Sequence, residues 1–232
     1  MSLLLLSQPL KYFRRHTIII YQKDKSFNFN VLRKKDLSII DAIFFKQKNA
    51  IIVMHGLVSF LDASHYKTVE DIWSELETNF GLTGIKVTPY PHFSWQVAED
   101  YEWDVIAEKM KEISENTTPF IVRTAGLGIF SGESPIIFIA VVKDLNLIKH
   151  HTDIFNTVEP VAKGIVPYYH PNVWVPHISL AYSDVIENNI GVIMRFLSFR
   201  HFNWEIEIDN LALIYEPTGS IGQLKYKFKF SG

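Results

Sequence analysis

A pentapeptide pattern occurs twice in this chain and restricts the folds that the sequence can adopt. The two copies are Pro91-His92-Phe93-Ser94-Trp95 and Pro176-His177-Ile178-Ser179-Leu180. In a β-strand, side chains two positions apart share a face, so each His lies beside its Ser while the apolar residues point to the other side. A preceding proline favours an extended backbone at a strand start or at an exposed sheet edge. The pattern therefore predicts two similar strands, each with one polar face and one face for a core.

Apolar spacing elsewhere in the chain predicts helices mixed with strands and hairpins, which is an α+β class rather than a doubly wound sheet. Helical spacing occurs at 69–80 with Gly81 as a stop signal, at 103–113 after an acidic stretch, at 147–162, and at 190–197 after a capping pair formed by Asp184 and Glu187. Strand-like segments are 50–61, 90–97, 120–130, 136–142, 175–182, 204–209 and 224–230. We expect one domain over residues 49–232, preceded by an N-terminal extension (1–48) with short strands at 17–21 and 27–32.

Composition excludes several classes of protein. Of 232 residues, 47% are hydrophobic, which allows a sizeable core, and the net charge of −2 provides no general field for gripping long nucleic acid. A small nucleotide or the end of a short RNA remains a possible ligand. The chain has no cysteine for disulfides or thiolate metal sites. Because no apolar run approaches the roughly 18 residues of a membrane span, we expect a cytoplasmic protein, and we expect it to be a monomer.

The two motifs have the groups that a phosphodiester reaction needs. Histidine titrates near pH 6.5, so one imidazole can take a proton from an attacking hydroxyl while the other protonates the leaving oxygen. The hydroxyls of Ser94 and Ser179 can donate to the non-bridging phosphate oxygens. A single His-x-Ser is a weak signal, but two copies with matching flanks favour His92 and His177 as catalytic residues. No third His or carboxylate stands at ligand spacing beside them, so we expect neither a metal nor another cofactor.

Aromatic residues flank both motifs. A base could stack on these rings, and ordinary packing in an aromatic-rich chain explains them equally well. The candidates for substrate stacking are Tyr90, Tyr168, Tyr169, Trp174 and Tyr182.

The motifs resemble those of the two-histidine (2H) phosphoesterase superfamily, the LigT-like or 2′-5′ RNA ligase-like proteins. The segment from Val175 to Ala181 is the most similar, Pro91 to Trp95 fits the first motif, and 119–142 is similar to the central segment of the family. The resemblance implies a bilobal, pseudo-two-fold fold of antiparallel sheets with outer helices and a central cleft that holds both motifs. It also implies metal-independent action on 2′,3′-cyclic phosphates or 2′-5′ linkages. Both hydroxyl positions are Ser where many members have Thr, and no motif matches a basic residue that some members place near the phosphate.

Three functions are compatible with these residues. The first is a 2′,3′-cyclic phosphodiesterase acting on nucleotides or RNA ends, in which either histidine could be the base. The second is a 2′-5′ RNA ligase, because the same two groups can catalyse the reverse reaction. The third is a nucleotide-binding module without useful catalysis.

Overall fold

Two four-stranded antiparallel sheets form the framework of the domain in the computed structural model, which describes residues 53–217 and 221–232. The predicted extension 1–48 and its strands lie outside the described residues. The first sheet has the order β10 (Gln223–Lys229), β9 (Asn210–Tyr215), β1 (His55–Phe60) and β2 (His92–Ala98). The second has the order β7 (His177–Ala181), β5 (Ile136–Val141), β4 (Phe120–Phe130) and β8 (Glu205–Ile208). Each motif strand, β2 or β7, is therefore an edge strand of its sheet, as the prolines suggested.

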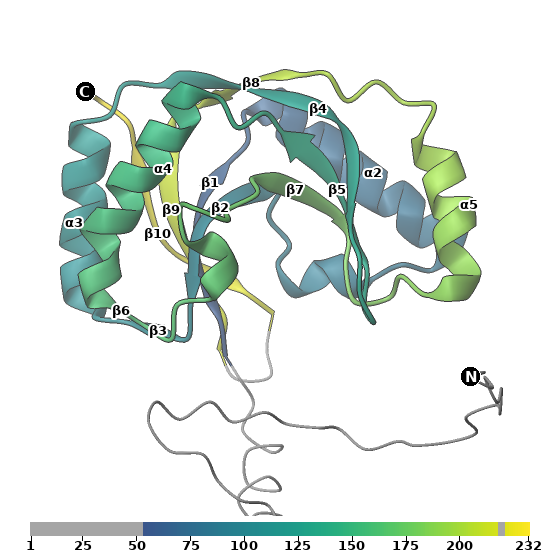
Figure 1. Cartoon of the computed structure of the whole chain (residues 1–232), viewed down its shortest axis with the longest axis horizontal. Helices are drawn as coiled ribbons and strands as arrows, with labels where there is room; N and C mark the ends of the chain where they lie inside the picture. Colours follow the sequence, from purple (N-terminus) through teal and green to yellow (C-terminus); the bar gives the residue numbers. More distant parts are fainter. Residues whose placement is uncertain (1–52, 218–220) are drawn as a thin grey trace, which may run out of the picture. The chain divides into compact units, whose positions relative to one another are not determined.

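The helices lie on the outer sides of the two sheets (Figure 1). Helices α3 (Trp103–Glu115) and α4 (Leu145–Val158) pack on the first sheet, and α2 (Ala63–Phe80) packs on β7 of the second with α5 (Glu187–Leu197) beside it. Short elements complete the domain: the 3-10 helices Gly84–Val87, Glu159–Val161 and Pro167–Tyr169, and a two-stranded pair of β3 (Asp100–Tyr101) with β6 (Ala162–Lys163). None of the helices in the described part of the chain has the length and apolar character to cross a membrane.

The chain contains two copies of a strand–helix–strand unit, which form the two halves of the domain. The helix of each half packs on the motif strand of the other half. Units β1-α2-β2 and β5-α4-β7 each place a His-x-Ser strand at a sheet edge, yet α2 packs on β7 and α4 packs on β2. This crossed packing of the two helices joins the halves through a common core. The predicted α+β class, with its pseudo-two-fold arrangement of antiparallel sheets, is confirmed.

The two faces of each motif strand have the predicted environments. Phe93, Trp95, Ile178 and Leu180 are at most 1% exposed and belong to the same core cluster. The His and Ser side chains of both motifs are only partly buried. Alternation in the sequence therefore gives the orientation of both strands correctly.

The structure adds a strand that the sequence analysis did not predict. Strand β9 occupies a central position between β1 and β10, and its residues Leu211 to Ile214 are at most 3% exposed. A strand buried on both faces has no polar–apolar alternation, so the periodicity that identified its neighbours is absent.

Two predicted helix boundaries are also wrong. Asp184 does not cap α5, whose N-cap is Ile186; its carboxylate instead accepts hydrogen bonds from the backbone amides of Thr83 and Gly84, both at 2.7 Å. Helix α4 ends at Val158 rather than continuing to 162 as predicted, because Pro160 lacks the amide that a continuing α-helix requires. In contrast, α2 ends as predicted at Gly81, which has a φ of 70°.

Candidate functional site

The two motif strands lie next to each other where the sheets meet (Figure 1). Each motif strand is also bound by an indole group from the other half of the domain. Trp73 of α2 donates from Nε1 to the carbonyl oxygen of Ser179 at 3.1 Å, and Trp174, which precedes β7, donates from Nε1 to the carbonyl oxygen of Ser94 at 3.0 Å. The backbone at each motif serine is thus held by a residue from the other half.

Both motif histidines make the same hydrogen bond. Nδ1 of His92 lies 2.5 Å from the carbonyl oxygen of Tyr90, and Nδ1 of His177 lies 2.8 Å from that of Val175, in each case two residues earlier in the chain. A carbonyl oxygen only accepts, so Nδ1 carries the proton in both rings. The neutral imidazoles therefore each keep an unprotonated Nε2, which can accept a proton and later donate it.

Both imidazoles resist protonation more strongly than a free histidine. Burial lowers the pKa of His92 to about 4; the Tyr90 carbonyl opposes this shift, and the charge of His177 adds to it. Burial also lowers the pKa of His177, with the Val175 carbonyl opposing. Because a charge on His177 lowers the pKa of His92, the two rings lie within electrostatic range of each other.

A buried apolar cluster adjoins His92 and Ser94 on the first sheet. The strand register pairs Phe60 with His92 and Val58 with Ser94, so these four side chains share a face. The ring of Phe60 stacks on Tyr90 with centroids 5.4 Å apart. This face continues across β9 through Ala212 and Ile214, which complete a small cluster of buried residues.

Two phenylalanines, which the sequence analysis did not single out, surround His177. The ring centroids of Phe130 and Phe138 lie 4.8 and 5.2 Å from that of His177. Gly128 is required beside them, since a Cβ there would lie 2.4 Å from the Phe138 ring. Phe138 pairs with Ser179 in the register of β5 and β7, so only the strand pairing reveals this contact.

The five aromatic candidates have different positions. Trp174 is 2% exposed and stacks on His151 with centroids 3.7 Å apart, so a base cannot stack on it and this prediction is withdrawn. Tyr90 packs on Phe60, and its hydroxyl accepts from the Leu224 amide at 3.3 Å. Burial raises the pKa of Tyr169, a hydrogen bond with Ser94 lowers it, and Tyr182 raises it. The remaining candidate, Tyr168, is 80% exposed.

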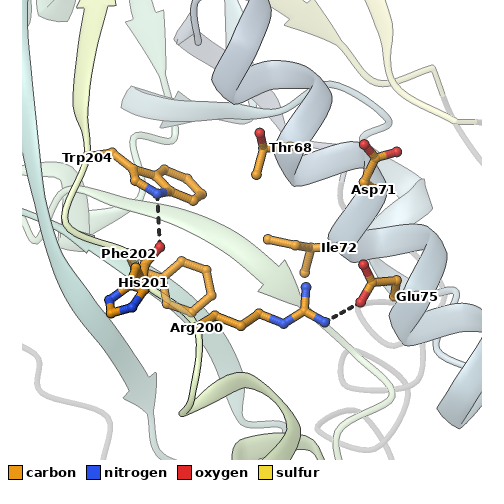
Figure 2. A pocket seen from close by; sticks show the side chains of 8 residues that line it. All are labelled: Thr68, Asp71, Ile72, Glu75, Arg200, His201, Phe202 and Trp204. Atoms are coloured by element: carbon orange, nitrogen blue, oxygen red, sulfur yellow. Dashed lines mark hydrogen bonds and ion pairs between the residues drawn. The ribbon is translucent and has the colours of Figure 1, made fainter.

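A separate surface pocket lies away from both motifs (Figure 2). It has a volume of about 220 Å³ between α2 and the segment before β8, and Arg200 forms an ion pair with Glu75 in its wall. None of the motif residues lines it. Among residues 53–217 and 221–232, no group of three or more His, Cys, Asp or Glu side chains is placed to hold a metal ion.

Comparison with known proteins gives the family. The family model described as the 2′-5′ RNA ligase superfamily matches residues 65–219, which include both motifs and more than half of the chain. The chain belongs to this superfamily, and this membership supports a phosphoesterase activity on a nucleotide or RNA substrate. A solved structure described as a phosphoesterase is similar, with 11% identity, a TM-score of 0.46, and coverage of 78% of this chain and 99% of the other. No curated protein matches the sequence.

Proposed function

We propose that this protein hydrolyses 2′,3′-cyclic phosphates of nucleotides or RNA ends, with His92 and His177 as the acid–base pair and without a metal. The observation that supports this most directly is the matched hydrogen bonding of the two imidazoles on adjacent strands. Each ring presents Nε2 for proton transfer, while a backbone carbonyl holds Nδ1–H and stabilises the imidazolium.

The proposed reaction has one displacement at phosphorus. A water oxygen forms a bond to phosphorus while Nε2 of one histidine takes the water proton. The bond from phosphorus to one ribose oxygen breaks, and the other histidine protonates that oxygen from Nε2. The hydroxyls of Ser94 and Ser179 donate to the non-bridging oxygens as negative charge increases on them. The product is a phosphate monoester with a free ribose hydroxyl.

Within this proposal we assign His92 as the base, because burial and the charge of a protonated His177 lower its pKa to about 4 and so keep the ring neutral. His177 serves as the acid. A bound anionic phosphate raises the pKa of both rings, and this favours a protonated His177 in the complex.

The proposal is tested by incubating the purified full-length protein with the four 2′,3′-cyclic nucleotides and a short RNA that ends in a cyclic phosphate, with a chelator present. We expect ring opening to a phosphate monoester in the presence of the chelator. A 5′-hydroxyl RNA added in excess detects the reverse, ligating reaction. Nucleotide binding without any product, or product only after a divalent metal is added, would overturn the proposal.

A further inference from the structure

Strand β10 brings a lysine to the face of the first sheet that carries His92 and Ser94. The register pairs Lys227 with Ala212, Ala212 with Val58, and Val58 with Ser94, so these residues form one row across the four strands. Side chains in such a row project from the same face of the sheet. Lys227 therefore shares the face of the candidate site, although it lies far from both motifs in the sequence.

The side chain of Lys227 reaches from β10 over a residue of β1. Its Nζ lies 4.9 Å from the ring centroid of Phe60, a β1 residue whose register partner is His92. The ammonium of this β10 residue thus lies beside a side chain of β1, the strand that pairs with β2. Lys227 is exposed, and it forms no ion pair with a carboxylate of the described residues.

The other two lysines of β10 are engaged elsewhere. A register shift between Leu224 and Tyr226 turns Lys225 to the opposite face, where its Nζ lies 4.3 Å from the ring centroid of Trp103. Lys229 lies 3.7 Å from Asp209 in an ion pair. The lysine on the site face without a carboxylate partner among the described residues is thus Lys227.

We infer that Lys227, above the Phe60 ring, forms a subsite for a second phosphate of the substrate, one nucleotide away from the phosphate that reacts. This inference rests on the proposed function, because it places the reacting phosphate at His92 and Ser94. A single cyclic nucleotide has no group for this subsite. The preferred substrate class is therefore an oligonucleotide that ends in a cyclic phosphate and has an internal phosphodiester.

Three adenosine substrates with a terminal 2′,3′-cyclic phosphate test the subsite in the full-length protein. They are the mononucleotide, the dinucleotide with a normal internal phosphodiester, and the dinucleotide with a neutral methylphosphonate at that position. In Lys227→Gln we expect kcat/KM on the normal dinucleotide to fall about 3- to 10-fold, the size of one charge-assisted contact, with little change on the other two substrates. The salt dependence of its log kcat/KM becomes shallower by about 0.7, as expected for one lost phosphate contact on a single strand.

Lys225→Gln is the matched control, because it removes the same charge from the same strand on the opposite face. It leaves the preference for the charged dinucleotide unchanged. An equal effect of Lys227→Gln on all three substrates, or no effect on any, overturns the subsite while the proposed function stands. If the wild-type protein hydrolyses none of the three, the proposed function fails. Equilibrium binding of the two dinucleotides then decides on the subsite, and equal affinities for wild type and Lys227→Gln overturn it.

Discussion

The two halves of the domain hold the same motif strand in different surroundings. In both, a proline precedes an edge strand, Nδ1 of the histidine donates to the carbonyl two residues before it, and an indole from the other half binds the carbonyl of the serine. The sheet face that carries His92, however, also carries Phe60, which stacks on Tyr90, and Lys227, whose ammonium lies over the Phe60 ring. The rings of Phe130 and Phe138 lie beside His177 instead.

This difference lets a symmetric fold place two like groups in unlike surroundings, as the proposed mechanism requires. The repeated backbone gives both rings the same Nδ1 hydrogen bond, while burial lowers the proton affinity of each. An acid–base reaction needs one neutral and one protonated imidazole, and mutual repulsion of the two charges disfavours double protonation. In the proposed mechanism, the charge of a protonated His177 keeps His92 neutral.

The largest effect is expected from removing either imidazole. His92→Ala and His177→Ala should each lower kcat on a cyclic phosphate by about 10² to 10⁴, the usual contribution of a general acid or base. The two variants separate on a 4-nitrophenyl phosphodiester, whose leaving group departs without a proton. There the His177 variant should recover most of its activity and the His92 variant should not, as measured by steady-state release of 4-nitrophenolate.

His201→Ala is the control for this experiment, since His201 is exposed and lines the pocket of Figure 2. It should keep wild-type rates on both substrates. Recovery of the His92 variant instead of the His177 variant would reverse the assigned roles. Full activity on the cyclic phosphate in either motif variant would disprove the two-histidine mechanism.

A second difference concerns the two indoles that bind the serine carbonyls. Among the described residues, a buried histidine stacks on Trp174 and none stacks on Trp73. His151 is 1% exposed, stacks on Trp174, and its Nε2 lies 3.0 Å from the carbonyl oxygen of Trp95. Burial lowers the pKa of His151 to about 4, Lys143 and His170 lower it further, and the carbonyls of Trp95 and Tyr169 oppose the shift. The folded protein therefore requires this ring to be neutral.

This requirement predicts a stability that depends on pH. The unfolded chain binds the proton near pH 6.5 and the folded chain only near pH 4, so the stabilising contribution is complete above 6.5 and falls as pH drops toward 4. The loss amounts to at most about 3 kcal/mol in the free energy of unfolding. Urea unfolding at pH 7.5 and 4.5 measures it, and His151→Phe should reduce the difference between the two pH values by about that amount.

His201→Phe is the comparison variant, because it replaces an exposed histidine with the same side chain. Its stability should decrease between pH 7.5 and 4.5 as much as that of the wild type. An unchanged difference in His151→Phe would show that this ring is not held neutral.

The sequence predicted the parts of the fold and site that depend on local periodicity. Alternation in 92–95 and 177–180 gave the polar and apolar faces of both strands, and Gly81 marked the end of α2. What depends on strand pairing could not be read in this way. The neighbours Phe130 and Phe138 approach His177 through the pairing of β4, β5 and β7, whose members are distant in the sequence.

Strand β10 also shows that sequence alternation alone does not predict which face of a sheet a residue occupies. In the sequence, Lys225, Lys227 and Lys229 alternate with apolar residues as if all three shared a face. A register shift after Leu224 separates Lys225 from the other two, and such a bulge changes the facing of every residue on one side of it. Lys227, which the sequence analysis did not single out, thus lies on a strand that it did predict and on the sheet face that carries His92.

The smallest effect is expected from removing the hydrogen bonds that the two indole groups donate to the serine carbonyls. It tests whether the two halves of the domain are energetically coupled. Trp73→Phe and Trp174→Phe each remove a hydrogen bond to a motif serine carbonyl, which should cost about 1 kcal/mol of stability, with the larger loss for the more buried Trp174. A modest decrease in kcat should accompany each. Since β2 and β7 are in contact, the double variant should deviate from additivity by about 0.5 kcal/mol or more in urea unfolding. Strict additivity would mean that each indole holds only its own strand and that the relative position of the two imidazoles is fixed by the core alone.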